Sequence, residues 1–305
     1  MTRKQKLGWT VVSSFFGITF ILSGFASLFS DFAPAVFALL LGAALSLPGF
    51  RLIKSKVEKK RAERLLSEQR RIAAEETRLA REHREQAAYD FSVELSEIPC
   101  VEITPVASGK RLRSLDSMPP ISLSRVSSRT KPEKLFPLVF IDLETTGLSP
   151  DKERIVEVSA IRYDAPFVAT ACFNTLINPQ IHIPDRAYEV HGISDDDVEL
   201  APVFADIVPD LAAFVDGANL IGHNIMFDLR FLYRAGLDLS ESVRYFDTVQ
   251  IAKAANPEVS NHKLVTLCSH YGIYRNNAHT ALSDCYATAK VFENLLADLG
   301  CLRPD

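Results

Sequence analysis

Two carboxylates at the end of an apolar run are the first residues whose types and spacing could do chemistry. Residues 138–141 are all apolar, and Asp142 and Glu144 follow directly. Successive side chains of a strand point to opposite faces, so these two acids project on the same side. They repel each other unless a positive group, most simply a divalent cation, lies between them. Surface strands also carry such pairs, so the pattern alone leaves a metal site and an ordinary acidic surface both open.

Further acids and a histidine occur in two later segments. A short apolar segment ends in His223 and Asn224, and Asp228 follows where the first turn of a helix is expected. The helix dipole also favours an acid there without any function. His279 and Asp284 are five residues apart, so on one helix their side chains would be roughly 140° apart. If both serve one site, His279 must lie at or before the start of the helix and Asp284 in its first turns; taken alone, this spacing is mostly coincidence.

The spacing of apolar residues predicts the elements that must position these side chains. Apolar runs predict strands over residues 138–141, 155–163, 168–177 and 220–221. Helical spacing predicts helices over residues 201–215, 225–235, 251–255, 264–271 and 281–299. Three strands followed by alternating helices and short strands indicate an α/β fold with a mixed central sheet.

In this order and spacing, the three acidic segments resemble the DEDDh branch of the 3′→5′ exonucleases. That branch includes the epsilon subunit of bacterial DNA polymerase III, ribonuclease T and oligoribonuclease. The family motif consists of four acids and one histidine, and all five positions are filled, by Asp142, Glu144, Asp228, His279 and Asp284. The histidine marks this branch rather than the one that uses tyrosine. The resemblance covers residues 136–299 and implies a ribonuclease H-like exonuclease fold.

The resemblance also implies a cofactor and residue roles. Two Mg²⁺ or Mn²⁺ ions are expected, held by the four acids, with Asp142 bridging them. Oxygen ligands suit these hard cations. His279 is the candidate general base for the attacking water, since an ordinary histidine pKa of about 6.5 suits a proton acceptor near neutral pH.

Substrate contacts are predicted around the motif. Thr145 and the backbone near Thr146 and Gly147 are expected to hold the terminal sugar, and segment 188–193, with His191, resembles a family segment beside the substrate groove. His223, Asn224 and Phe227 are candidates for lining the groove, although packing and turn capping explain them equally well.

The N-terminal residues 1–50 predict a transmembrane helical hairpin. Two apolar runs, residues 7–29 and 32–50, would span roughly 34 and 28 Å as helices, close to a hydrocarbon core of about 30 Å. Basic residues flank both ends, which predicts a bacterial-type inner (plasma) membrane protein with both termini and the exonuclease domain in the cytoplasm. The alternative is a cleaved signal peptide over the first run.

The residues between hairpin and domain fall into two regions. Residues 51–94 have a composition typical of helices, and predict a charged helical stalk. Its apolar positions recur every seven residues but form a narrow stripe, which favours a solvated helix over a weak homodimer. Residues 95–135 contain five prolines in a serine-rich run and predict a flexible linker. Residues 300–305 are expected to form a short tail.

Charge and cysteine content narrow the function further. Residues 1–87 carry 15 Lys/Arg against 8 Asp/Glu, residues 88–135 carry 7 against 6, and residues 136–305 carry 12 against 24. So acidic a domain argues against nonspecific duplex binding, whereas a short single-stranded 3′ end needs fewer phosphate contacts. The five cysteines lack CxxC spacing, so reduced thiols are expected rather than a zinc site or a disulfide framework.

The leading hypothesis is a membrane-anchored, metal-dependent 3′→5′ exonuclease. It would hydrolyse phosphodiester bonds at the 3′ end of single-stranded nucleic acid, with DNA favoured and short RNA an option, and release nucleoside monophosphates. One alternative is a non-catalytic tether that binds nucleic-acid ends or a replication partner, although the complete set of five motif residues argues against it. Another is a polymerase-associated proofreading subunit, which is less favoured because no clear polymerase-binding tail follows the predicted domain.

Overall fold

The computed structural model describes residues 48–107, 112–239, 243–274 and 280–301. The chain divides into two units, Met1–Leu79 and Ala80–Asp305. Helix α3 (Pro48–Glu97) passes from the first unit into the second. The predicted membrane hairpin lies outside the described residues except for its last three, which begin α3. Within the described part of the chain, no helix is both long and apolar enough to cross a membrane.

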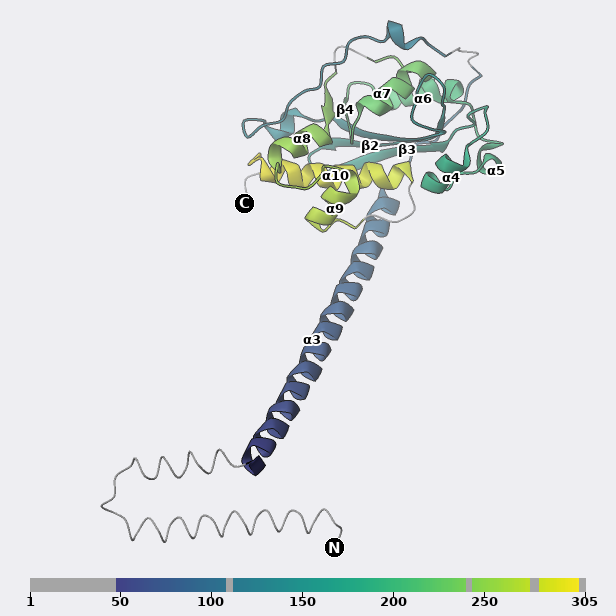
Figure 1. Cartoon of the computed structure of the whole chain (residues 1–305). Coiled ribbons are helices and arrows are strands. Elements are labelled where there is room, and N and C mark those ends of the chain that lie inside the picture. Colours follow the sequence, from purple (N-terminus) through teal and green to yellow (C-terminus); the bar gives the residue numbers. More distant parts are fainter. Residues whose placement is uncertain (1–47, 108–111, 240–242, 275–279, 302–305) are drawn as a thin grey trace, which may run out of the picture. The chain divides into compact units, whose positions relative to one another are not determined.

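A five-stranded sheet forms the centre of the second unit (Figure 1). Its strand order is β3-β2-β1-β4-β5, with bounds β1 Leu138–Thr145, β2 Ile155–Ala165, β3 Val168–Leu176, β4 Asn219–Gly222 and β5 Tyr245–Asp247. Neighbours among β1, β2 and β3 run antiparallel, whereas β1, β4 and β5 run parallel. The prediction of a mixed α/β sheet is therefore confirmed. β5 was not predicted, since three residues are too few to show periodicity.

Helices cover both faces of the sheet. On one face α10 (Ala281–Asp298) contacts β1 and β2, and α8 (Thr248–Ala255) and α9 (Leu264–Tyr271) pack beside it. On the other face α6 (Phe204–Val215) contacts β2, and α7 (Met226–Ala235) contacts β1. The short helices α4 (Asp185–His191) and α5 (Asp195–Val198) follow β3 in the chain.

The alternation of side chains in β1 divides the core into two clusters. Leu138 and Phe140 pack on the α10 side, whereas Val139 and Ile141 pack on the α6 and α7 side. Because strand side chains alternate, the even-numbered residues that follow, Asp142 and Glu144, belong to the α10 side. The strand continues to Thr145, so both acids lie within it, as their predicted alternation requires.

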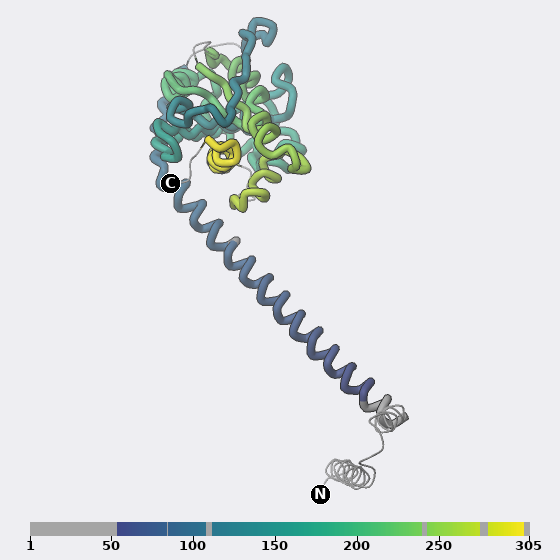
Figure 2. The backbone as a smooth tube through the Cα atoms, turned by 90° about the vertical axis from the view of Figure 1, so that its left-hand side faces the viewer, coloured from purple at the N-terminus to yellow at the C-terminus, as the bar shows by residue number. Residues whose placement is uncertain are grey.

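Residues 98–107 and 112–135, here called the strap, pack along the domain, where the sequence predicted a flexible linker (Figure 1 and Figure 2). The Val101 N–H donates to the Cys172 carbonyl at 2.8 Å, and the Ser124 N–H donates to the Tyr245 carbonyl at 2.7 Å. Its scattered apolar residues fill gaps in the core, among them Ile103, Leu115, Met118, Ile121, Leu123 and the buried Val126. An extended strap has no fixed face, so its apolar residues showed no period.

Cys100 and Cys172 form a disulfide between the start of the strap and β3. This differs from the expectation of reduced thiols. A separation of 72 residues hid the pair from any spacing rule, since only the packing of the strap on β3 brings them together. Cys268 and Cys285 are buried, and Cys301 is partly exposed.

Candidate active site

Three carboxylates converge where β1 ends. One oxygen each of Asp142, Glu144 and Asp284 can be chosen so that all three lie within 4.8 Å of one another. The two strand acids point toward the α10 face, and Asp284 meets them from the first turn of α10. Asp284 is buried, whereas Asp142 and Glu144 are partly exposed. The structure thus unites the first and third acidic segments, as the sequence predicted.

Asp228 is the fourth acid that the sequence predicted for this site. It lies in the first turn of α7, which follows β4, the parallel neighbour of β1, and it is only 3% exposed. Burial raises the pKa of Asp228 well above its usual range, and backbone hydrogen bonds, including one with Leu143, offset part of that effect. Burial likewise raises the pKa of Asp142, and the negative charge of Asp228 is the next largest cause. The two carboxyls therefore interact electrostatically.

Glu157 is a fifth acid in this group that the sequence analysis missed. It lies on β2 directly opposite Glu144, on the α10 side, and is buried. Its Oε2 accepts a hydrogen bond of 3.1 Å from the Ala281 N–H, at the start of α10. Burial raises the pKa of Glu157, the charge of Asp284 adds to this, and the Ala281 bond opposes it. The spacing from Asp142 carries no signal, because only strand pairing brings Glu157 to the site.

His279 lies outside the described residues. Helix α10 begins at Ala281, with the Thr280 hydroxyl capping it by accepting from the Ser283 N–H at 3.3 Å. Position 279 therefore precedes the helix in the chain, which is the order that a shared site with Asp284 requires. The role of His279 stays a prediction.

The turn after β1, where Thr145 and nearby backbone groups were predicted to contact substrate, is held by side-chain hydrogen bonds. The Thr146 hydroxyl is fully buried; it donates to Glu153 Oε2 at 2.7 Å and accepts from the Arg154 N–H at 3.0 Å. The Thr145 hydroxyl donates to the Gly147 carbonyl at 2.8 Å. A Cβ on Gly147 would lie 2.8 Å from the Glu153 carboxyl, so a larger residue there would displace the Glu153 side chain. Thr146 thus stabilises the turn, and its hydroxyl is already engaged within the protein.

His191 lies at the end of α4, close to the end of β1. It is buried, and its Nδ1 accepts a hydrogen bond of 3.0 Å from the Ile193 N–H. Nε2 is buried without a hydrogen-bond partner among the described residues. Burial lowers the pKa of His191, and the nearby backbone of Thr145 opposes the shift. His191 therefore lies near Thr145 with a neutral imidazole favoured, and its place beside a substrate groove stays a prediction.

The other groove candidates have partners within the fold. His223 Nδ1 lies 2.9 Å from the Thr248 hydroxyl. Asn224 has a left-handed backbone with φ of 68°, and its N–H donates to Asp247 Oδ1 at 3.0 Å. Phe227 packs on Phe231 with ring centroids 4.9 Å apart. These contacts support the packing and capping interpretation.

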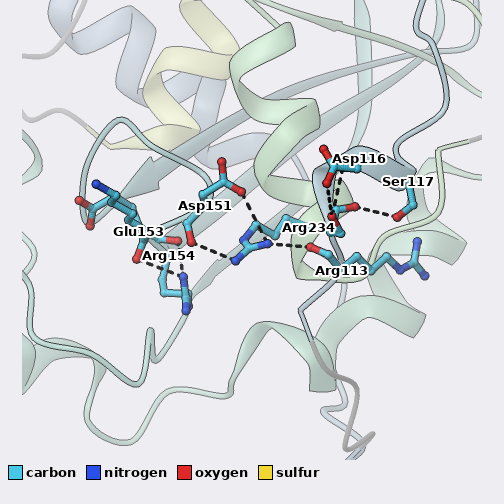
Figure 3. A network of polar contacts seen from close by, with 9 residues as sticks. Arg113, Asp116, Ser117, Asp151, Glu153, Arg154 and Arg234 are labelled. Carbon is cyan, nitrogen blue, oxygen red and sulfur yellow. Dashed lines mark hydrogen bonds and ion pairs between the residues drawn. The ribbon is translucent and has the colours of Figure 1, made fainter.

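A polar network ties α7 to the turn after β1 (Figure 3). The Arg234 guanidinium, near the end of α7, donates to the Arg113 carbonyl at 2.8 Å and to the Asp151 carbonyl at 2.9 Å. Arg113 in turn pairs with Asp238 at 2.7 Å. Arg234 therefore joins α7, the helix that carries Asp228, to the strap and to the loop before β2.

The clustered acids form a donor set that suits a divalent cation. Carboxylate oxygens are the ligands that hard divalent ions prefer. Three of them lie within reach of one ion, and Asp228 lies beside Asp142. A cation among these groups would relieve the repulsion that raises their pKa values.

Comparison with known proteins shows to which family the chain belongs. A profile of an exonuclease family, that of ribonuclease T, matches residues 139–292, just over half of the chain. The chain belongs to this exonuclease family. The match contains Asp142, Glu144, Asp228, His279 and Asp284 and ends within α10. The predicted exonuclease domain is confirmed.

Individual relatives include bacterial DNA polymerase III proteins. DNA polymerase III subunit epsilon from Treponema pallidum is 34% identical over 162 residues, 51% of this chain and 74% of that protein. The PolC-type DNA polymerase III of Caldanaerobacter subterraneus subsp. tengcongensis is 32% identical over 165 residues. That match covers 53% of this chain but only 12% of the polymerase, so the exonuclease corresponds to a small part of such proteins. E. coli exonuclease I in complex with a dT13 oligonucleotide has a TM-score of 0.46 and 23% identity over 52% of this chain and 40% of its own.

Proposed function

We propose that the exonuclease domain hydrolyses phosphodiester bonds in the 3′→5′ direction at the end of single-stranded nucleic acid and releases nucleoside monophosphates. The observation that carries the proposal is the convergence of Asp142, Glu144 and Asp284 within 4.8 Å, in a chain of an exonuclease family. DNA is the favoured substrate, because the curated relatives are named as DNA polymerase III subunits or enzymes. Short RNA is the other polymer to test.

Asp142, Glu144, Asp228 and Asp284 would hold the cations, Mg²⁺ or Mn²⁺. When bound, such ions activate water and stabilise charge on the leaving oxygen. The acids themselves bind the ions in their deprotonated form, so loading releases the protons that burial favours on Asp142 and Asp228.

His279 would accept the proton of the attacking water at an imidazole nitrogen. Its position in the chain just before α10 supports this role, since a residue ahead of the helix is not held at the roughly 140° that would separate it from Asp284 on the helix. His191 and the backbone of Thr145 and Gly147, which surround the end of β1, would contact the terminal nucleotide.

The direct test uses the full-length chain in detergent with single-stranded DNA and RNA oligonucleotides labelled at either end. Under Mg²⁺ or Mn²⁺, the 3′ label should appear at once as a mononucleotide, and the 5′ label should pass through a ladder of shortening products. A chelator and the Asp142→Asn variant should abolish both signals. Stable oligonucleotides in the presence of either metal would refute the enzyme and favour the non-catalytic tether.

A proofreading subunit is a second candidate, supported by the similarity to subunits named DNA polymerase III epsilon. The discriminating substrate is a primer–template with a mispaired 3′ terminus. A proofreading enzyme should remove the mispaired nucleotide faster than a matched one and should co-purify with a polymerase. Equal rates and purification without a polymerase would favour an independent exonuclease.

We also propose that residues 1–50 anchor the protein in a bacterial-type plasma membrane, with the exonuclease domain in the cytoplasm. The support is the length of the two apolar runs and their basic flanks. The Cys100–Cys172 disulfide points the other way, because disulfides persist in oxidising compartments. Protease added outside spheroplasts should leave the exonuclease domain intact. Digestion of the domain without lysis would show that the domain lies outside the cytoplasm.

Two partner proposals remain for α3. Its basic N-terminal part would contact anionic lipid headgroups, and its apolar stripe would form a weak homodimer. Leu65, Ile72 and Leu79 recur at seven-residue spacing and are each more than half exposed. Gln69 and Glu76 between them are polar, so any association should be weak. Sedimentation of the wild type and of the Ile72→Glu variant in detergent measures the oligomeric state of each. If both sediment as monomers, the dimer is excluded.

A further inference from the structure

We propose that the last two turns of α3, around Phe91 and Glu94, are positioning elements of the active site, although they precede the family match at residue 139. They pack against the helix that carries Asp284 and against the chain just before residues 275–279. This inference rests on the proposed function, because it concerns how the third acidic segment is held in place. It assigns the end of α3 to the catalytic domain.

Phe91 is the apolar part of this contact. It is 8% exposed, while Tyr89, two residues earlier on the same helix, is 65% exposed. Its ring meets Tyr286 of α10 edge-on with centroids 4.9 Å apart, and meets Tyr274 in the same manner at 6.2 Å. Aromatic pairs in this arrangement stabilise a contact beyond the effect of the area that they bury. Phe91 therefore belongs to the α10 core cluster.

Glu94 is the polar part, one turn further along α3. The Tyr286 hydroxyl donates to Glu94 Oε2, and Lys290 Nζ lies 3.1 Å from the same oxygen. Lys290 also lies over the Tyr286 ring, 5.1 Å from its centroid. The Tyr286 hydrogen bond lowers the pKa of Glu94, so the carboxylate is charged at neutral pH. Three side chains on two elements thus fix the relative position of α3 and α10.

The chain that follows Glu94 fixes the same segment from its other end. Ile98 is buried in the α10 cluster. The Cys172 N–H donates to the Pro99 carbonyl at 2.8 Å, and the Val101 N–H donates back to the Cys172 carbonyl at 2.8 Å. This pairs the segment with β3, the edge strand of the sheet. The end of α3 is therefore held at both the helix and the sheet.

The contacts of Phe91 involve residues on both sides of the third acidic segment in the sequence. Tyr286 lies two residues after Asp284 on α10, so a shift of α10 at Tyr286 is carried to Asp284. Tyr274 is the last described residue before segment 275–279, which contains His279. A displacement of about 1 Å in a catalytic group can cost on the order of 100-fold in rate. The end of α3 is thus placed to set the position of Asp284 among the clustered acids.

The test compares Phe91→Ala with the matched control Tyr89→Ala in the full-length protein. The readouts are kcat and KM on single-stranded DNA, the Mn²⁺ concentration for half-maximal rate, and Mn²⁺ binding by calorimetry without substrate. We expect Phe91→Ala to lower kcat about 10- to 100-fold and to weaken Mn²⁺ binding, with KM nearly unchanged. Tyr89→Ala should match the wild type in all three.

Glu94→Gln keeps the proposal testable if Phe91→Ala fails to fold, since it changes only one exposed charge. It should weaken Mn²⁺ binding in the same direction by a smaller factor. Wild-type kcat and Mn²⁺ binding in Glu94→Gln, or in a folded Phe91→Ala, would overturn the inference and leave a purely structural contact. An inactive wild type that still shows the Phe91→Ala loss in Mn²⁺ binding would refute the proposed function but not this coupling.

Discussion

At the scale of single residues, Glu157 shows that an acid of the cluster can stabilise the fold without being a predicted metal ligand. Its carboxylate lies opposite Glu144 and near Asp284, yet it also accepts the Ala281 N–H. That hydrogen bond fastens the start of α10 to β2. A carboxylate that accepts a buried backbone donor has a structural task that an amide could also perform, and this makes its role testable.

Glu157→Gln and Glu157→Ala should therefore differ. Glutamine retains an acceptor for the Ala281 N–H and removes a charge near Asp284, so stability and turnover should stay close to wild type. Alanine leaves a buried N–H unpaired, which should lower the free energy of unfolding by about 1–3 kcal/mol. Chemical denaturation and turnover assays measure both. If Glu157→Gln lost metal binding as fully as Asp142→Asn, Glu157 would be a ligand instead.

His279→Ala should keep metal binding but lose most turnover, because the variant removes a proton acceptor and no carboxylate ligand. General-base catalysis contributes about 10²- to 10⁴-fold, which sets the expected loss. Calorimetry with Mn²⁺ and single-turnover assays separate the two properties. Near-wild-type turnover in this variant would remove His279 from the mechanism.

At the scale of elements, the site depends on how β1, α7 and α10 are held together. β1 supplies two acids by alternation, and α10 brings Asp284 to the same face. α7 brings Asp228 because β4 pairs with β1 in parallel. The Arg234 network then ties the end of α7, the helix that carries Asp228, to the strap and to the loop after β1, the strand that carries Asp142 and Glu144.

Arg234→Ala should destabilise the domain by about 1–3 kcal/mol, because the Arg113 and Asp151 carbonyls would lose their guanidinium donor. The exposed Arg230 on the same helix is the matched control, and Arg230→Ala should change the free energy of unfolding by less than about 0.5 kcal/mol. Urea denaturation measures both variants. Equal stability of the two would mean that the network contributes nothing to the packing of α7.

At the scale of the whole molecule, the concentration of acid in residues 136–305 should govern the response to pH. Burial raises the pKa values of Asp142, Asp228 and Glu157 in the folded state. A carboxyl whose pKa is raised on folding favours the folded state while protonated. Its contribution is present below the ordinary carboxyl pKa of about 4 and is lost as pH rises through the higher folded value.

The metal-free protein should therefore lose stability as pH rises from about 4 through the raised folded pKa values of these acids. Mg²⁺ or Mn²⁺ should raise the Tm more at pH 8 than at pH 5, because the ions bind the deprotonated carboxylates. Thermal melts with chelator and with each metal measure this. The Asp142→Asn/Asp228→Asn double variant should show a flatter pH profile and little response to metal; a response equal to wild type would place the bound ion elsewhere.

The sequence predicted this architecture well where local rules apply. Strand alternation placed Asp142 and Glu144 on one side, and helical spacing predicted α6, α7, α9 and α10 to within a few residues. It failed where structure depends on distant partners. The strap showed no period, so it was interpreted as flexible, and β5 was too short to detect.

The sequence by itself determined the set of motif residues and predicted which of them share a face, because spacing within a strand or helix fixes where neighbouring side chains point. Only the tertiary structure decided which other groups share the site. Strand pairing places Glu157 opposite Glu144, and the Glu153 contact engages the Thr146 hydroxyl. The packing of α3 on Tyr286 joins the residues before the family match to Asp284. Burial and hydrogen-bond partners depend on segments far apart in the chain, and no local pattern records them.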